Sequence, residues 1–143
     1  MSPKFGETKI VEYDDFEVTV STATAGMAME RDVAIDESDD WLKERGYTRE
    51  QVFNDQVDHR TKRIHFLLIA IRPQCLGALK EWRRDGQALT IPTIDQFLGL
   101  PEPLIHSWYA AAIGLNPHWL PPVERPEEEK KRTETRRGSS RKS

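Results

Sequence analysis

The acidic run Asp36-Glu37-Ser38-Asp39-Asp40 comes closest, in residue types and spacing, to a metal site. Its oxygens fall at alternate positions, as they do in the first half of a calcium-binding loop. Such a loop requires Gly at its sixth position and Glu at its twelfth, whereas this sequence has Trp41 and Tyr47 there. We therefore interpret the run as a solvated acidic turn and expect no metal.

The other side chains that commonly do chemistry form no catalytic set. The histidines lie too far apart in the sequence to pair at the three- or four-residue spacings that helices use for ligands. They are His59, His65, His106 and His118. The sequence has no Gly-rich phosphate loop, zinc-protease motif or Gly-x-Ser-x-Gly turn, and Cys75, near Leu76 and Leu79, is expected to be a packed thiol. We expect no catalytic residue, no cofactor and no enzyme activity.

Binding to other proteins is the function that the side chains favour. Met27 and Met29 sit among alanines and could form an adaptable contact surface, although core filling is the commoner role of methionine. Trp119 and Leu120 follow the last expected helix, at the edge of the folded part, where a Trp often anchors an interface. The alternative for that Trp is docking back onto the core. The candidate partner-binding residues are Met27, Met29, Trp108, Tyr109, Trp119 and Leu120.

Charge is distributed unevenly along the 143 residues. Residues 1–120 carry 13 Lys and Arg against 19 Asp and Glu, a net charge of -6, whereas residues 121–143 carry 8 against 5, a net charge of +3. The second segment is rich in proline and charge and has no aromatic residue, so it cannot bury enough apolar surface to order itself. We therefore predict a single folded domain over 1–120 and a disordered charged tail over 121–143.

An α+β fold, mostly helical, is predicted for the folded part. Phe16, Val18 and Val20 alternate with polar residues, which predicts a β-hairpin over about 9–21 that turns at Asp14-Asp15. Helical spacing, capping boxes at Thr48 and Thr93, and Pro or Gly near helix ends predict helices after it. Their ranges are about 22–35, 48–71, 73–85, 93–98 and 102–115, with a short turn around Trp41 capped by Ser38. We expect the hairpin to pack on a bundle of four or five helices.

Residues 91–119 resemble the end of the small tail assembly chaperones of long-tailed phages and prophages. In those proteins a short helix, a Leu-Pro-Glu junction and a Trp-bearing helix that closes on Asn-Pro-x-Trp precede a polar tail. This sequence has Leu100-Pro101-Glu102, then Trp108, then Asn116-Pro117-His118-Trp119. The resemblance is clearest over residues 90–120, about a fifth of the chain, and it includes no catalytic signature.

The resemblance implies a chaperone that binds the apolar helices of the tape measure protein, keeps that protein soluble and helps to recruit tail tube subunits. It also implies a cytoplasmic protein of the host cell that is absent from the mature virion. The expected partners are the tape measure and tail tube proteins, further copies of the chain are candidate partners, and no membrane is expected. The alternative is a small protein that binds nucleic acid through its basic C-terminal tail, with an affinity that falls steeply with salt.

Overall fold

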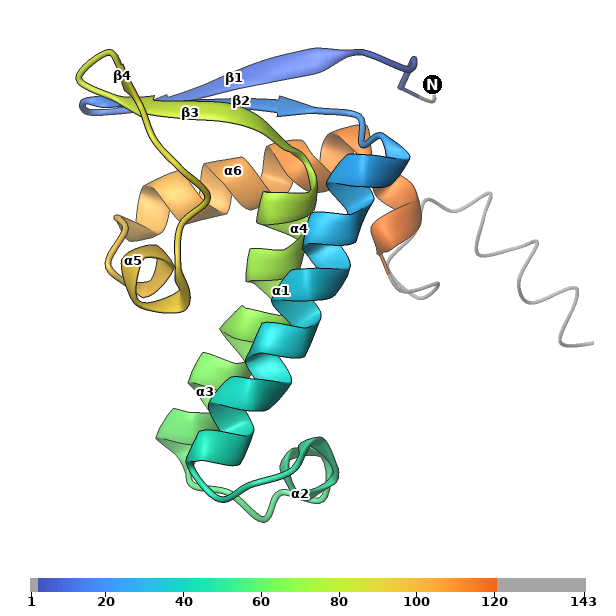
Figure 1. Ribbon diagram of the computed structural model, residues 1–143, viewed down its shortest axis with the longest axis vertical. Coiled ribbons are helices and arrows are strands. Elements are labelled where there is room, and N and C mark those ends of the chain that lie inside the picture. Colours follow the sequence, from blue (N-terminus) through green and yellow to red (C-terminus); the bar gives the residue numbers. More distant parts are fainter. Residues whose placement is uncertain (1–2, 121–143) are drawn as a thin grey trace, which may run out of the picture.

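The computed structural model describes residues 3–120, and in it an antiparallel sheet lies across one end of a group of helices (Figure 1). The strands are β1 (Thr8–Tyr13), β2 (Phe16–Ser21), β3 (Leu79–Arg84) and β4 (Gln87–Ala88). The helices are α1 (Ala25–Glu44), α2 (Arg49–Phe53), α3 (His59–Phe66), the π-helix η1 (Leu67–Ile71), α4 (Arg72–Gly77), α5 (Ile94–Leu98), α6 (Glu102–Leu115) and the 3₁₀ turn η2 (Pro117–Trp119). The predicted α+β, mostly helical class is confirmed, and the predicted tail over 121–143 lies outside the described residues.

The N-terminal hairpin forms where the alternating pattern predicts it. β1 and β2 pair antiparallel with Val11 opposite Val18, and the turn between them holds Asp14 in a left-handed conformation (φ 52°). Asp is among the few residues besides Gly that tolerate this conformation, which explains why Asp-Asp can close the hairpin. The alternation buries Phe16 and Val18 on the face turned toward the helices.

A single long helix, α1, replaces the two segments predicted between residues 22 and 46. Thr24 caps its N-terminus by accepting a hydrogen bond from the Met27 amide. Gly26 lies in the first turn of α1, where the entropic cost of fixing a glycine does not interrupt the helix. Ser38 does not cap a new turn but donates to the Ile35 carbonyl within the helix, and Gly46, just beyond the end, takes a positive φ.

The helix predicted over 48–71 is divided. α2 opens with the predicted capping box, in which the side chains of Thr48 and Gln51 each bond the other's backbone amide. The chain then leaves the helix through Asp55 (φ 56°), and Asp58 caps α3 by accepting from the Thr61 amide. The prediction of one helix was wrong because Asp side chains offer the backbone hydrogen bonds that compete with a continuous helix.

Pro73 does not end the helical rod, contrary to the predicted break before it. α3, η1 and α4 follow one another without a non-helical residue, and Pro73 is in the first turn of α4. Proline lacks the backbone N–H that a regular helix needs as a hydrogen-bond donor, and its ring crowds the preceding turn. The wider π-helical turn that immediately precedes α4 accommodates both effects.

The predicted helix over 73–85 was wrong beyond Gly77. The segment after α4 is strand β3, which pairs with β2 so that Trp82 lies opposite Val18, and the sheet order is β1-β2-β3-β4. Trp82 also stacks on Phe16 with ring centroids 6.2 Å apart. The helical spacing of Cys75, Leu79 and Trp82 is therefore coincidental, because pairing with a distant strand overrides the local pattern.

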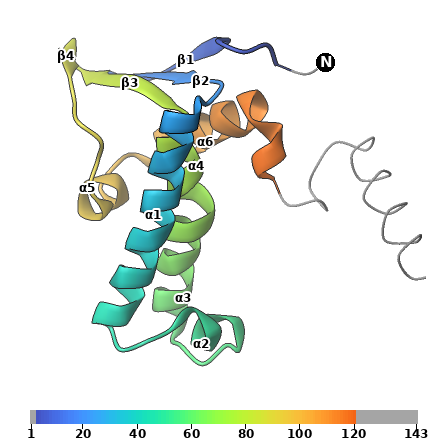
Figure 2. The ribbon, with the colours of Figure 1, turned by 45° about the vertical axis from the view of Figure 1, so that its right-hand side comes forward.

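The last two helices form as predicted. α5 opens with the capping box of Thr93 and Gln96, and α6 spans Glu102–Leu115. α6 runs beneath the sheet, while α1 lies beside the α3–η1–α4 rod and descends away from the sheet (Figures 1 and 2). Among residues 3–120, none of the helices combines the length and apolar character needed to cross a bilayer.

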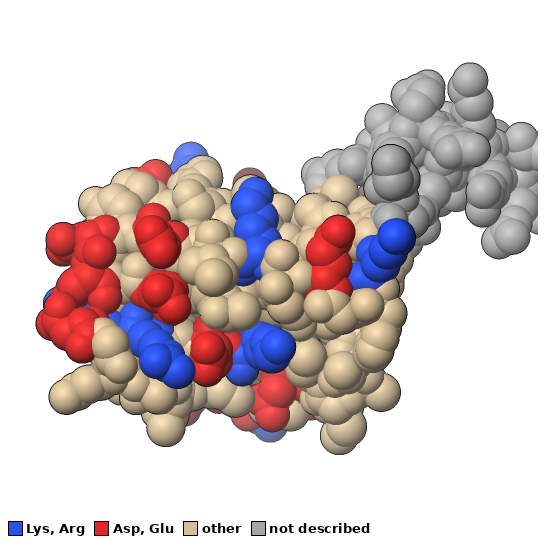
Figure 3. Space-filling model, turned by 90° about the horizontal axis from the view of Figure 1, so that it is seen from above, with Lys and Arg blue, Asp and Glu red and all other residues tan. Residues whose placement is uncertain are grey.

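Two hydrophobic clusters hold the described chain together. The larger one joins the inner face of the sheet to α4 and α6 and contains sixteen buried residues, with Trp108 between Trp82 and Phe97. The smaller one lies between α1 and the rod and contains three: Trp41, Leu42 and Leu68. The sheet's other face is open to solvent, and acidic side chains gather at the end where its two turns lie (Figure 3).

Candidate functional site

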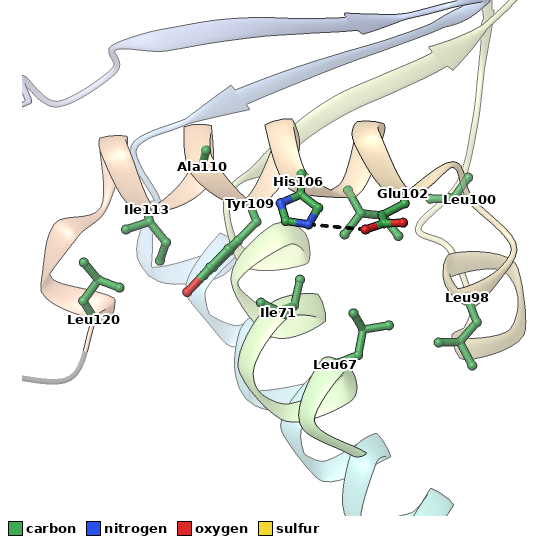
Figure 4. A pocket seen from close by; sticks show the side chains of 11 residues that line it. Leu67, Ile71, Leu98, Leu100, Glu102, His106, Tyr109, Ala110, Ile113 and Leu120 are labelled. Carbon is green, nitrogen blue, oxygen red and sulfur yellow. Dashed lines mark ion pairs between the residues drawn. The ribbon is translucent and has the colours of Figure 1, made fainter. Parts of the chain in front are cut away.

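An apolar groove lies along α6, between that helix and η1 (Figure 4). We call it the α6 groove. It has a volume of about 690 Å³, within the range of ligand-binding clefts. Its lining residues are Leu67 and Ile71 of η1, Leu98 of α5, Leu100 between α5 and α6, Glu102, Ile105, His106, Tyr109, Ala110 and Ile113 of α6, and Leu120.

The groove exists because α6 is apolar on two sides. One stripe, which includes Leu104, Trp108 and Leu115, packs against the core. A second stripe of Ile105, Tyr109 and Ile113, each four residues apart, faces the groove. A helix that is apolar nearly all round is usually buried on every side. Here Ile105 is buried in the core cluster, whereas Tyr109 and Ile113 are half-buried and leave part of their surface to the groove.

Opposite that stripe, the π-helix supplies the other wall. Leu67 and Ile71 are half-buried and project from η1 toward α6 in Figure 4. A π-helix turn is wider than an α-helix turn and is often found at functional sites. Leu67 and Ile71 thus form one side of the groove, opposite the side chains of α6.

Two polar side chains of the groove, Glu102 and His106, are at its rim. Glu102 and His106 are one helical turn apart on α6 and largely exposed, with His106 Nε2 3.8 Å from a Glu102 carboxylate oxygen. An exposed pair at this distance contributes little to stability. The walls therefore offer mainly hydrocarbon surface, which suits a ligand's apolar side chains.

The structure brings Tyr109 and Leu120 of the predicted binding residues together in this groove. Trp108 does not join them: it is fully buried, and its indole Nε1 donates to the Cys75 carbonyl at 3.0 Å. It is a core residue and presents no surface to a partner here. Burial also raises the pKa of the Cys75 thiol far above neutrality, in keeping with the predicted packed cysteine.

The remaining predicted residues lie elsewhere. Trp119 docks back on the core, where the Arg31 guanidinium lies 5.3 Å from its ring centre, which is the alternative foreseen for it. Met27 is half-buried and its sulfur accepts from the Ser21 hydroxyl at 3.8 Å. Met29 is 65% exposed on α1 and does not line the groove.

No protein-family model, curated protein or solved structure matches this chain.

Sequence reasoning missed most of the lining of the groove. The Ile105, Tyr109 and Ile113 stripe was readable as a second apolar face of the final helix. Nothing in the sequence indicates that Leu67 and Ile71 lie opposite it, because that juxtaposition depends on the rod continuing through Pro73.

Proposed function

We propose that this chain is a non-catalytic tail assembly chaperone, which binds apolar helices of a phage tape measure protein, keeps that protein soluble and helps to recruit tail tube subunits. The observation that carries the proposal is the α6 groove, an apolar channel that runs along α6. Grooves of this kind bind amphipathic helices, whose apolar side chains recur every three or four residues.

The size and chemistry of the groove fit such a client. α6 has 14 residues and is therefore about 21 Å long, enough to contact about four turns of a client helix. The apolar residues of both walls would be covered by the client's apolar stripe, and the Glu102–His106 pair would stay at the wet rim. Many copies would bind along one long client, and self-association of those copies would strengthen the binding at each groove.

The test is co-expression of the chain with the tape measure protein encoded in the same genome. The soluble fraction of the tape measure protein is measured with the unchanged chain, with Ile113→Glu and with Tyr109→Glu. A carboxylate in the groove would be buried against the client without a partner. Each variant should therefore reduce the soluble tape measure protein by about tenfold.

Ser107→Glu is the matched control, because it adds the same charge to an exposed site on α6 outside the groove lining. It should keep the client as soluble as the unchanged chain does. Circular dichroism verifies that all three variants fold. If Ile113→Glu protects the client as well as Ser107→Glu does, the groove is not the client site.

Salt separates this proposal from the alternative of nucleic-acid binding through residues 121–143. A complex that depends on apolar burial persists at high salt, whereas binding to phosphates weakens steeply. The complex recovered in the co-expression experiment should survive a wash in molar salt and should not require the basic tail.

A further inference from the structure

A second pocket lies at the opposite end of the rod from the sheet, between α2 and α3. We call it the α3 pocket. It has a volume of about 680 Å³ and shares no lining residue with the α6 groove. Its lining residues are Arg49, Val52 and Phe53 of α2, His59, Lys62, Arg63, His65 and Phe66 of α3, and Ile69 of η1.

Two exposed aromatic rings flank the α3 pocket. Phe53 is 79% exposed and Phe66 is 62% exposed, and both line the same cavity with Ile69. A single exposed apolar side chain needs no explanation, but apolar side chains gathered around a cavity mark a binding surface. The pocket can therefore cover an apolar side chain of a ligand.

Every ionisable residue that lines the α3 pocket is basic. Arg49 is paired with Asp39 at 2.7 Å and Lys62 with Asp55 at 2.8 Å, so these two charges are partly neutralised. Arg63 is exposed and makes no ion pair within residues 3–120. The pocket thus presents one uncompensated guanidinium beside two phenyl rings.

The inner wall of the pocket is a buried imidazole. His65 is 3% exposed, and its Nε2 atom has no hydrogen-bond partner in the described chain. Burial is the main cause that lowers the pKa of His65, the Arg49 charge lowers it further and the Asp39 carboxylate partly offsets both. The inner wall is therefore uncharged at neutral pH, and the positive charge is confined to the mouth.

We propose that the α3 pocket binds an acidic protein segment, in which a carboxylate side chain pairs with Arg63 while a neighbouring aromatic or long aliphatic side chain packs between Phe53 and Phe66. Charge complementarity selects this occupant, because the pocket lining has three permanent cations and no carboxylate. The inference does not depend on tape measure binding in the α6 groove.

Single-stranded nucleic acid is the less favoured ligand for the same surface. Stacking on Phe53 and Phe66 would suit bases, but a phosphate chain needs a continuous basic track. Here Asp55 and Asp58 lie beside the pocket, on the segment between α2 and α3, and Asp55 already neutralises Lys62. One free guanidinium suits a carboxylate better than a polyanion.

The test uses three fluorescent probes with the full chain: a short peptide in which glutamate alternates with leucine and phenylalanine, the same peptide with lysine for each glutamate, and oligothymidylate. Fluorescence anisotropy gives the Kd of each. The acidic peptide should bind, and the lysine peptide and oligothymidylate should bind at least about tenfold more weakly. Preference for either of those two probes would overturn the proposal.

Two variants locate the site. Arg63→Glu and Phe66→Ser should each weaken binding of the acidic peptide by about tenfold, because one removes the charge partner and the other the apolar wall. Arg60→Glu is the matched control, since it makes the same charge change at an exposed position of α3 outside the pocket lining. Arg63 and Phe66 are both exposed, so their substitution should leave the fold intact, and thermal melting verifies this. An equal loss in Arg60→Glu and Arg63→Glu would show attraction to net charge alone and would refute the site.

Discussion

At the scale of single residues, Gly77 sets how closely α1 approaches α4. A Cβ atom added at Gly77 would lie 2.8 Å from Cβ of Arg31 and 3.1 Å from Cη2 of Trp119. Cβ of Arg31 is fixed to the backbone of α1, so relieving the clash would require the whole helix to move. Overpacking of this kind typically costs about 1–3 kcal/mol. We expect Gly77→Ala to lower the free energy of unfolding by that amount in urea denaturation.

Gly114→Ala is the control for that prediction. Gly114 lies in α6, and a Cβ atom there would meet no heavy atom within 4 Å. Alanine should therefore stabilise the helix by about 0.5–1 kcal/mol relative to glycine. If the two substitutions change the free energy of unfolding in the same direction, close helix contact is not the role of Gly77.

The sequence does not reveal such contacts between distant residues. Gly77 is readable only as the possible end of a helix, because Arg31 and Trp119 come from segments far away along the chain. Asn116 is similar: it is readable as a helix end before Pro117. Folded, its side chain also donates to the Ser21 carbonyl at 3.1 Å and accepts from the Ala23 amide at 2.9 Å.

At the scale of elements, the capping boxes were correct signals, and the signals that need a distant partner failed. Both capping boxes and the boundaries of α5 and α6 were predictable, because a cap involves residues only three apart. β3 was not, because its strand conformation follows from pairing with β2. The same holds for the groove. The sequence indicates the apolar face of α6, but it does not indicate that η1 lies opposite that face.

The cap of α5 gives a prediction at this scale. Thr93 accepts from the Gln96 amide at 3.2 Å, and α5 places Leu98 in the α6 groove. We expect Thr93→Ala to cost about 1 kcal/mol of stability, and to loosen that end of the groove. Thr93→Ser retains the hydroxyl and should cost much less. Thermal unfolding monitored by circular dichroism compares the two, and equal losses would mean that the methyl group matters more than the cap.

At the scale of the whole molecule, the two hydrophobic clusters contribute unequally to the stability of the fold. The cluster under the sheet has sixteen buried residues, whereas the one between α1 and the rod has three. The buried Arg72 links these regions: its guanidinium donates to Glu37 of α1 at 3.1 Å and to the Pro92 carbonyl at 2.8 Å. The α6 groove lies against the larger cluster, while the α3 pocket lies at the end held by the smaller one.

This division predicts a gradient of hydrogen exchange along the rod. Segments with few buried apolar contacts open locally at a lower free energy than the global unfolding free energy. Amides of α2 and α3 should therefore exchange at least about tenfold faster than those of β2, α4 and α6. Exchange followed by mass spectrometry or NMR measures this on the unchanged chain. Adding the acidic peptide should slow exchange in α2, α3 and the adjoining η1 and leave β2 and α6 unchanged, because a ligand stabilises only the openings that would release it. Uniform exchange across all helices would mean that the two clusters unfold as one unit and that the α3 pocket is as rigid as the α6 groove.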